Sequence, residues 1–228
     1  MIKLIAWCGG GVFVASLILT AWWYFVALGR QEPAAVSGAA LSWNAALVTA
    51  FALHHSLFAR DAIKRRLAVV PDRLLRSFYV WIASTLLIAV VLLWQPVGGE
   101  LYRIEGVAAW LFVAVQLAGL SVMVKAVAGL DPLELAGIRQ ASGSVKPAAP
   151  LLDTGVYGLV RHPLYLGWLV LFFAVPHLTG DRLAFAALTS LYLLAAVPLE
   201  ERSLRKSFGD EYVRYAEKVR WRIVPFIY

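Results

Sequence analysis

The residues whose types could support chemistry are concentrated in the last third of the chain, between positions 151 and 225. Two long apolar segments in this region are bordered by polar and ionisable side chains, namely Tyr157, Arg161, His162, Tyr165, Glu200 and Glu201. An ionisable group at the end of a membrane-length segment costs free energy unless it pairs with another group or binds a ligand. We therefore expect the functional site in this region.

The run Arg161-His162-Pro163 predicts the start of a helix, because proline is favourable in a first helical turn. His162 and the backbone N–H groups of that turn would stabilise an anion. Arg161 adds a permanent cation suited to a carboxylate. Positive charge flanking a membrane segment is the alternative for Arg161, and an interfacial aromatic belt is the alternative for Tyr165 and Trp168.

Glu200 and Glu201 are adjacent acids at the predicted inner end of an apolar helix. Consecutive residues on a helix point about 100° apart, so one carboxylate can face the helix bundle while the other meets Arg202 or Arg205. The helix dipole disfavours a carboxylate at a helix C-terminus, which indicates a partner: a bound cation, ribose hydroxyls or an arginine. A structural salt bridge to Arg161 or Arg139 is the alternative.

His54 and His55 end another apolar segment. Consecutive histidines diverge on a helix and no Asp, Glu or Cys cluster joins them, so we expect no metal site. A histidine that faces a substrate and accepts a proton near neutral pH is one hypothesis, and interfacial packing is the alternative. The single cysteine, Cys8, excludes an intramolecular disulfide. The three glycines at positions 9–11 predict close helix packing.

The composition predicts an all-α, polytopic integral membrane protein. Hydrophobic residues make up 61% of the 228 positions and charged residues 15%, and the mean hydropathy of +0.73 is too high for one soluble core. A spanning helix needs about 20 mostly apolar residues, which predicts six spans at residues 4–28, 41–59, 77–97, 106–128, 163–178 and 183–199. The first run is longer than the apolar core of a signal peptide, so we expect it to be retained. We expect one membrane domain over residues 1–228, with a four-helix part at 1–128 and a cofactor-binding part at 129–228.

The basic residues predict the orientation. With these spans, 18 of the 21 Lys and Arg residues fall on one side, and the other side holds Arg30, Arg103 and Arg182. Positive residues remain in the cytoplasm, so both termini are predicted to be cytoplasmic in the inner membrane. This bias also accounts for the net charge of +7 without nucleic acid as a partner.

Two segments outside the spans are expected to contribute to the site. Residues 129–162 form a long loop with several turn signals, and loops of this length are often lids or binding loops. Phe208, Tyr212, Tyr215 and Val219 recur on one helical face among basic residues. This pattern predicts a C-terminal amphipathic helix in the membrane interface, with a break at Gly209.

Motifs in these segments resemble a known superfamily. RHPLYLG at 161–167, followed by LEERSL at 199–204 and FGDEYVRYAEKV at 208–219, is similar to the isoprenylcysteine carboxyl methyltransferase and phospholipid methyltransferase superfamily, membrane enzymes that use S-adenosylmethionine. HHSLFAR at 54–60, RSFYVWIAS at 76–84 and DPLELAGIRQ at 131–140 resemble its NnrU-like branch, which includes methanethiol S-methyltransferase.

The resemblance implies residue roles. Cofactor-binding positions would be Gln140, Leu151, Leu152, Tyr157, His162, Pro163, Leu164, Tyr165 and Glu200. From the chemistry of thiol methylation, we further hypothesise that Arg161, His162 and Glu200 are catalytic and that His54 and His55 contact the substrate. Arg161 or one of these histidines would lower the pKa of the acceptor thiol or accept its proton.

One departure bears on the substrate. Ala196 stands where the prenylcysteine enzymes place an arginine linked to the substrate carboxylate, which favours a small uncharged or thiol acceptor. The function implied is S-methylation of a small thiol, such as methanethiol to dimethyl sulfide, with S-adenosylmethionine and membrane lipids as partners. Methylation of a prenylcysteine carboxylate or a phospholipid amine is an alternative, and so is a non-catalytic NnrU-like accessory role.

Overall fold

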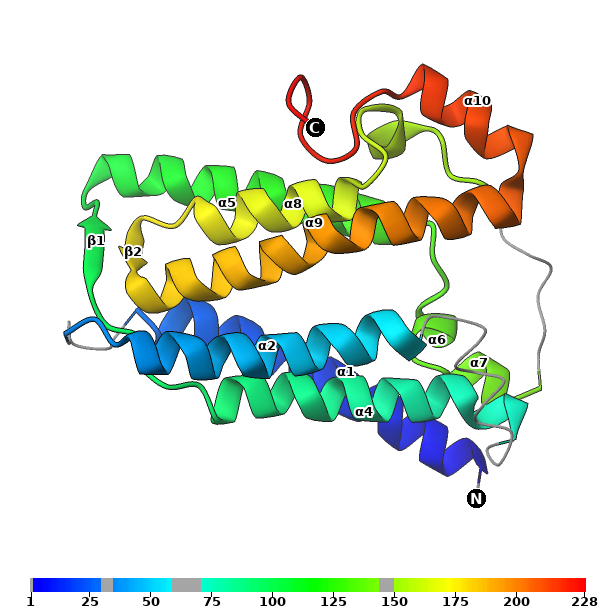
Figure 1. Ribbon diagram of the computed structural model, residues 1–228, viewed down its shortest axis with the longest axis horizontal. Coiled ribbons are helices and arrows are strands. Elements are labelled where there is room, and N and C mark those ends of the chain that lie inside the picture. Colours follow the sequence, from blue (N-terminus) through cyan, green and yellow to red (C-terminus); the bar gives the residue numbers. More distant parts are fainter. Residues whose placement is uncertain (1, 30–34, 59–70, 144–149) are drawn as a thin grey trace. The chain divides into compact units, whose positions relative to one another are not determined.

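The computed structural model describes residues 2–29, 35–58, 71–143 and 150–228, and it is mostly helical (Figure 1). The chain divides into two compact units. The first comprises Met1–Gly99 and Leu130–Pro147, and the second comprises Glu100–Gly129 and Ala148–Tyr228. The predicted loop at 129–162 is therefore divided between the units, and each unit is described by itself.

The first unit is built on three long helices: α1 (Ile2–Trp22), which the π-helical turn η1 (Trp23–Ala27) extends, α2 (Gly38–Phe58) and α4 (Asp72–Leu92). Two short helices, α6 (Pro132–Leu135) and α7 (Ile138–Ala141), complete it. A Cβ at Gly9 would lie 2.8 Å from the Trp81 ring, and one at Gly10 would lie 2.8 Å from Ile138. Close packing is thus confirmed at these two glycines, whereas Gly11 faces open space.

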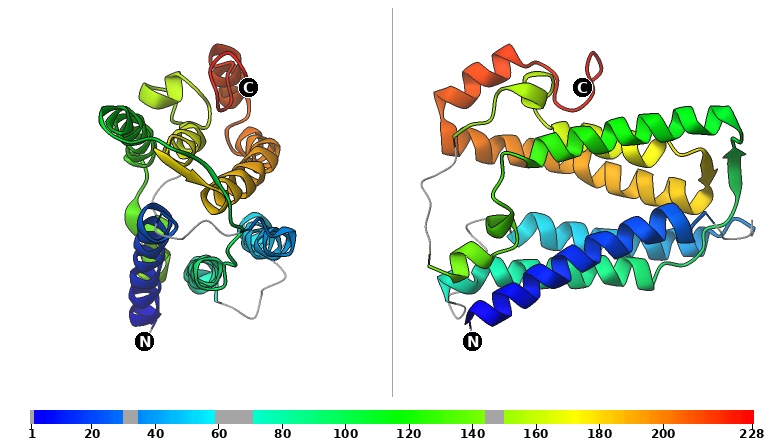
Figure 2. Two further views of the ribbon diagram at one scale, coloured as in Figure 1. Left: turned by 90° about the vertical axis from the view of Figure 1, so that its left-hand side faces the viewer. Right: turned by 180° about the vertical axis from the view of Figure 1, so that it is seen from behind.

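The second unit is built on two long helices, α5 (Val107–Val127) and α9 (Gly180–Phe208), and the shorter helix α8 (Pro163–Phe173). The antiparallel strands β1 (Glu100–Arg103) and β2 (His177–Thr179) form a ribbon at one end of these helices. The 3-10 turn η2 (Gly155–Gly158) and helix α10 (Asp210–Lys218) lie at the other end (Figures 1 and 2). The ribbon is a small addition to an otherwise all-α membrane protein.

Helices α5 and α8 approach closely because glycines face each other. A Cβ at Gly167 would lie 2.6 Å from the carbonyl oxygen of Gly119, and a Cβ at Gly119 would lie 2.9 Å from the backbone nitrogen of Leu171. Small residues allow such backbone contact between membrane helices. The contact sets the position of α8, and therefore of His162 at its start.

Four helices are long and apolar enough to cross a membrane: Ile2–Ala27, Arg73–Leu92, Val107–Val127 and Gly180–Phe208. The chain is therefore a multi-pass membrane protein. Helix α2 is not among these four, and α8 has only 11 residues, so the expected count of six is not reached among the described residues. Arg30 and most of the basic loop after α2 lie outside the described residues.

Two boundaries in the second unit differ from the prediction. Helix α8 ends at Phe173, before Pro176, and residues 177–179 pair as a strand; the residue before a proline avoids the helical conformation. Helix α9 continues through Glu200 and Glu201 to Phe208 and ends at Gly209, whose φ is +54°. The two acids therefore lie inside a helix, and the predicted conflict with a helix C-terminus does not arise. Helix-favouring residues at 199–206 carry the helix onward.

Candidate active site

The start of α8 is the centre of the candidate site. Its first helical residue is Pro163, as predicted, and His162 is its N-cap. The N–H of Arg161 donates to the carbonyl of Trp221 (2.9 Å), and the N–H of His162 donates to the carbonyl of Arg222 (2.7 Å). The sequence-based hypothesis was that unbonded backbone N–H groups at the start of this helix bind an anion. These two are instead bonded to the C-terminal segment.

Glu201 is buried and paired with two arginines. Its Oε1 lies 2.8 Å from Nε of Arg161, and its Oε2 lies 3.4 Å from Nε of Arg222. Arg161 also donates to the carbonyls of Ala216 (3.2 Å) and Val219 (3.4 Å), at the end of α10. The buried Glu201–Arg161 pair realises the structural salt bridge that the sequence left as an alternative. Breaking it would leave an uncompensated buried charge.

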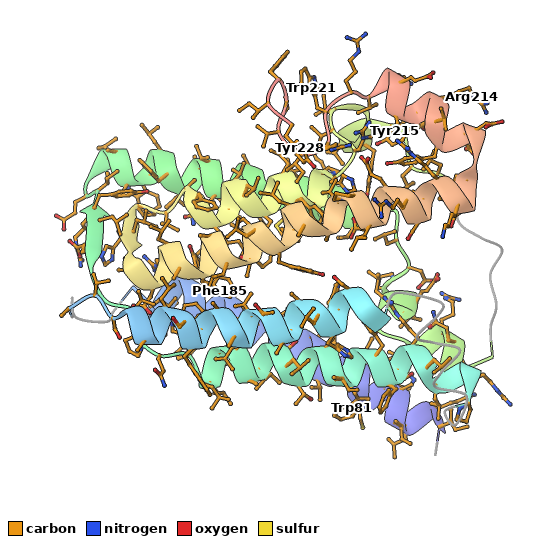
Figure 3. The ribbon with its side chains drawn as sticks, viewed as in Figure 1. Trp81, Phe185, Arg214, Tyr215, Trp221 and Tyr228 are labelled. Carbon is orange, nitrogen blue, oxygen red and sulfur yellow. The ribbon has the colours of Figure 1, made fainter. Side chains whose placement is uncertain are left out.

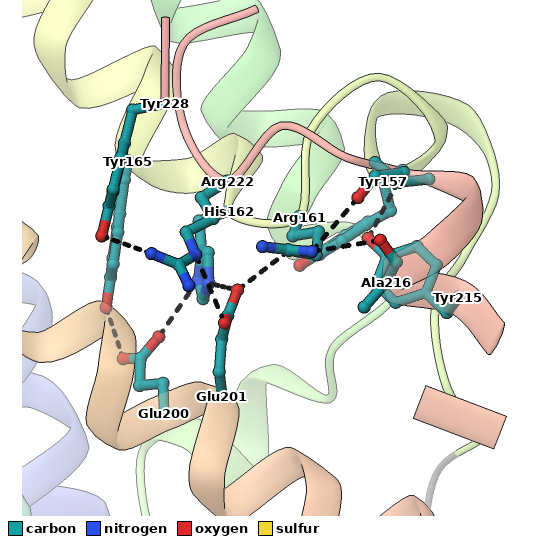
Figure 4. Close-up of polar contacts among 11 residues, drawn as sticks. Tyr157, Arg161, His162, Tyr165, Glu200, Glu201, Tyr215, Ala216, Arg222 and Tyr228 are labelled. Atoms are coloured by element: carbon teal, nitrogen blue, oxygen red, sulfur yellow. Dashed lines mark hydrogen bonds and ion pairs between the residues drawn. The ribbon is translucent and has the colours of Figure 1, made fainter. Parts of the chain in front are cut away.

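Glu200 has different surroundings from its neighbour. Its side chain is 46% exposed, it accepts a hydrogen bond from the Tyr165 hydroxyl, and its Oε2 lies 3.3 Å from Nδ1 of His162. The His162 ring stacks on Tyr165, with 5.3 Å between centroids. On its other side, Nε2 of His162 lies 3.6 Å from Glu201. His162 is therefore buried between a half-exposed and a buried carboxylate (Figure 4).

Tyr157 anchors the loop that leads to this turn. Its hydroxyl donates to the carbonyl of Ala126 in α5 (3.1 Å), and its carbonyl accepts from the Tyr215 hydroxyl (2.9 Å). Tyr215 points from α10 toward this loop, whereas Arg214 points outward (Figure 3). Burial raises the pKa of Tyr157, and the charge of Glu200 adds to this shift. Tyr157 is thus a neutral hydrogen-bond donor whose pKa is raised further by the charge of Glu200.

A hollow of about 220 Å³ lies beside Tyr157, between the end of α5 and the η2 turn. Its lining includes Leu152, one of the predicted cofactor contacts, and Lys125. Leu151 packs instead against an aromatic cluster of α10 that contains Tyr212 and Tyr215. The predicted site residues from 151 onward therefore all belong to the second unit.

The other predicted site residues belong to the first unit. Gln140 has a buried Oε1 without a hydrogen-bond partner among the described residues. His54 is buried, with its Nε2 3.3 Å from the carbonyl of Tyr79, and Nδ1 of His55 lies 2.6 Å from the Tyr79 hydroxyl. Their predicted roles in cofactor and substrate binding stay predictions. Among the described residues, no group of three His, Cys, Asp or Glu is placed to hold a metal ion.

Sequence reasoning missed the pairing of Glu201 with Arg222. The helix that carries Glu201 ends at Phe208, well before Arg222, and Arg222 is one of seven basic residues after Glu201. The pairing of Arg222 depends on how the chain turns after α10, and no sequence motif predicts that turn. Of the four arginines that the sequence indicated as partners for the two acids, Arg161 is the one that pairs with Glu201.

Comparison with known proteins decides the family. The chain is 35% identical over 187 residues to methanethiol S-methyltransferase 2 of Bradyrhizobium diazoefficiens, covering 80% of this chain and 72% of that protein. It is 32% identical over 195 residues to methanethiol S-methyltransferase of Pseudomonas deceptionensis, covering 80% and 74%. The chain belongs to the methanethiol S-methyltransferase family. This confirms the resemblance inferred from the motifs and the prediction of a methyltransferase enzyme.

The chain is also similar to a mammalian protein. Nurim of Rattus norvegicus is 29% identical over 180 residues, covering 73% of this chain and 69% of that protein. No protein-family model matches the chain, and no solved structure matches it. The family assignment therefore rests on the methanethiol S-methyltransferase relatives.

Proposed function

We propose that this enzyme transfers a methyl group from S-adenosylmethionine to a small thiol such as methanethiol. The thiol loses its proton, its sulfur forms a bond to the methyl carbon, and the bond from that carbon to the donor sulfur breaks. The products are dimethyl sulfide and S-adenosylhomocysteine. The observation that carries the proposal is the half-exposed carboxylate of Glu200, held by Tyr165 and His162 in a chain of the methanethiol S-methyltransferase family.

The residues of the site fit a sulfonium donor. When bound, S-adenosylmethionine supplies an activated methyl group on a positively charged sulfur, together with amino and ribose hydroxyl groups. Glu200 offers a carboxylate to the cationic or hydroxyl groups. Tyr157 and Leu152 line the hollow between the end of α5 and the η2 turn. The backbone of Leu151 and Leu152, Gln140, and the turn formed by Pro163, Leu164 and Tyr165 complete the proposed binding set.

The arginines of the site favour a neutral acceptor over a carboxylate. Arg161 and Arg222 both pair with Glu201, so each guanidinium already has a carboxylate partner within the protein. Ala196, one turn before Glu200, is buried and adds no charge. This position therefore offers no counter-ion to a carboxylate acceptor, whereas a small thiol needs none.

The proton of the thiol requires an acceptor, because the thiolate is the nucleophile. His162 is the candidate in the second unit, since its ring lies between Glu200 and Glu201 and is oriented by Tyr165. Its catalytic role and that of Glu200 belong to the proposal. Arg161 is bonded to Glu201 and to the end of α10, which favours a positioning role over direct catalysis. His54 and His55 are the alternative proton acceptors.

The setting of the enzyme also belongs to the proposal. We infer a protein of the inner membrane with six spans, in which α2 and the short α8 join the four longer helices. Both termini would be cytoplasmic, and α10 would lie in the interface with Tyr212 and Tyr215 toward the protein. The basic residues at this end of the second unit support that orientation.

Calorimetric binding of S-adenosylhomocysteine to the purified, detergent-solubilised protein tests the donor. We expect binding by the unaltered protein, loss of binding in Glu200→Ala, and unchanged binding in Glu211→Ala, which alters an exposed acid on α10. Methanethiol and a phospholipid amine are then compared as acceptors. A folded protein that binds no S-adenosylhomocysteine would refute the proposal, and methylation of the lipid alone would overturn the acceptor.

A further inference from the structure

The last ten residues, Val219–Tyr228, form a closed loop that we call the C-terminal strap. The carbonyl of Tyr228 accepts hydrogen bonds from the N–H groups of Arg222 (2.8 Å), Ile223 (2.8 Å) and Val224 (3.1 Å). The Arg222 guanidinium lies 5.1 Å from the centroid of the Tyr228 ring and donates to its hydroxyl (2.9 Å). Ile223 is 1% exposed, so the strap is anchored by burial as well as by hydrogen bonds.

The strap is bonded across the start of α8. The carbonyls of Trp221 and Arg222 accept the backbone N–H groups of Arg161 and His162. The Arg161 side chain also bonds the carbonyl of Val219, the first residue of the strap. Backbone groups next to a helix start need partners when they are buried. Here the strap supplies those partners.

A second connection runs through side chains to His162. The Tyr228 hydroxyl holds Arg222, Arg222 pairs with Glu201, and Glu201 lies 3.6 Å from Nε2 of His162. Hydrogen bonding to Tyr228 raises the pKa of Arg222, and the charge of Glu201 adds to the shift, so this cation remains charged. The strap therefore acts on both the backbone and the ring environment of His162.

We propose that Arg222 and Tyr228 are positioning residues of the methyl transfer, and that the strap holds His162 and the first turn of α8 in their reactive arrangement. This inference rests on the proposed function. Neither residue needs to touch the donor or the thiol. Because catalysis by alignment is sensitive to small displacements, a misplacement of about 1 Å lowers turnover about 100-fold.

Three substitutions test the side-chain contacts of Arg222 and Tyr228. Tyr228→Phe keeps the ring over Arg222 and removes the hydroxyl; Arg222→Ala removes both contacts; Arg222→Lys keeps the charge without the planar pair of donors. Arg220→Ala is the matched control, because Arg220 is exposed and only two positions away. Amide hydrogen exchange at Arg161 and His162, and kcat and KM for methanethiol, are measured for each variant.

We expect faster exchange at both amides and a kcat reduced about 10- to 100-fold in Arg222→Ala, with KM changed much less. Tyr228→Phe shows a smaller effect in the same direction, Arg222→Lys restores part of kcat, and Arg220→Ala matches the unaltered protein. Unchanged exchange in Arg222→Ala and Tyr228→Phe would contradict the proposal that Arg222 and Tyr228 hold the strap against the start of α8. Faster exchange with unchanged kcat would overturn its positioning role. Exchange is measured without donor or thiol, so failure of the proposed function is recognised separately, by absent S-adenosylhomocysteine binding in the unaltered protein.

Discussion

Glu200 and Glu201 are neighbours in the chain, yet their side chains have opposite surroundings. The Glu201 side chain is 6% exposed and bound to Arg161, whereas the Glu200 side chain is 46% exposed and meets Tyr165 and His162. The divergence of consecutive helical residues follows from helix geometry and was predicted. Which acid is buried depends on where Arg161 and Arg222 arrive, and this requires the three-dimensional structure.

This difference predicts separable effects of two isosteric substitutions. Glu201→Gln removes the charge that compensates two arginines, and breaking a buried pair costs about 3–5 kcal/mol. We expect a markedly lower thermal unfolding temperature for Glu201→Gln in detergent, together with lost turnover. Glu200→Gln should unfold close to the unaltered protein while losing S-adenosylhomocysteine affinity in calorimetry. Equal unfolding temperatures for the two variants would contradict the assigned roles.

A prediction for His162 concerns the path of the thiol proton. If His162 accepts this proton, His162→Ala lowers kcat for methanethiol by about 100- to 10,000-fold, the range for general base catalysis. Binding of S-adenosylhomocysteine should change much less. Loss of binding with little change in kcat would make His162 a binding residue instead. His55→Ala, in the first unit, is measured in parallel, because a larger effect there would move the base to the His55–Tyr79 pair.

At the scale of elements, the contact of α5 with α8 predicts sensitivity at two glycines. A Cβ at Gly167 or Gly119 would meet backbone atoms of the facing helix at 2.6–3.0 Å, which rotation of a side chain cannot relieve. We expect Gly167→Ala to cost about 1–3 kcal/mol and to displace the start of α8. Thermal unfolding and turnover are compared with Gly11→Ala, whose Cβ would have open space. Similar behaviour of the two variants would contradict the packing.

Helix α10 predicts a loss of stability at alkaline pH. Burial raises the pKa of Tyr212 to about 12, with a further contribution from the charge of Glu201, and burial also raises the pKa of Tyr215. An unfolded tyrosine titrates near pH 10. The folded protein keeps these protons more tightly, so their stabilising contribution is complete below about pH 10 and is lost as the pH rises through about 12.

The matched variant is Tyr212→Phe, because it removes the titrating hydroxyl and keeps the buried ring. Thermal unfolding is followed from neutral to alkaline pH in detergent. The unaltered protein should lose stability more steeply above about pH 10 than the variant does. Parallel pH curves would show that Tyr212 titrates normally.

The elements also show how far the sequence is informative. Local signals placed the start of α8 at Pro163 and the break at Gly209, because proline and glycine act through their own backbone geometry. The β1–β2 ribbon was not predicted, since its strands are short and separated by more than 70 positions, with Arg103 opposite His177. Pairing of such distant short segments is determined by the packing of the intervening helices.

At the scale of the whole molecule, each unit is built from two separate stretches of the chain, whereas the sequence-based subdivision placed one boundary between residues 128 and 129. The predicted long loop contributes Leu130–Pro147 to the first unit and its remainder to the second. The candidate site residues are therefore distributed over both units, with Gln140, His54 and His55 in the first. That the chain forms one membrane domain stays a prediction, and so does the joint use of these residues with Glu200.

The orientation of the second unit is open to direct measurement. The ribbon end carries Arg103 and Arg182, whereas nine basic residues lie toward the other end: Lys125, Arg161, Arg202, Arg205, Lys206, Arg214, Lys218, Arg220 and Arg222. This asymmetry predicts a cytoplasmic α10 and an external ribbon. Cys8 is the single cysteine, so a Cys8→Ser background allows one reporter thiol at a time.

Glu105→Cys, beside the ribbon, and Glu211→Cys, on α10, are both exposed positions. A membrane-impermeant maleimide should label Glu105→Cys in cells whose inner membrane is intact and should label Glu211→Cys only after that membrane is permeabilised. Labelling of Glu211→Cys in intact cells would reverse the orientation. It would also place the Glu200 site away from the cytosol, where S-adenosylmethionine is made, and so remove the proposed donor from reach.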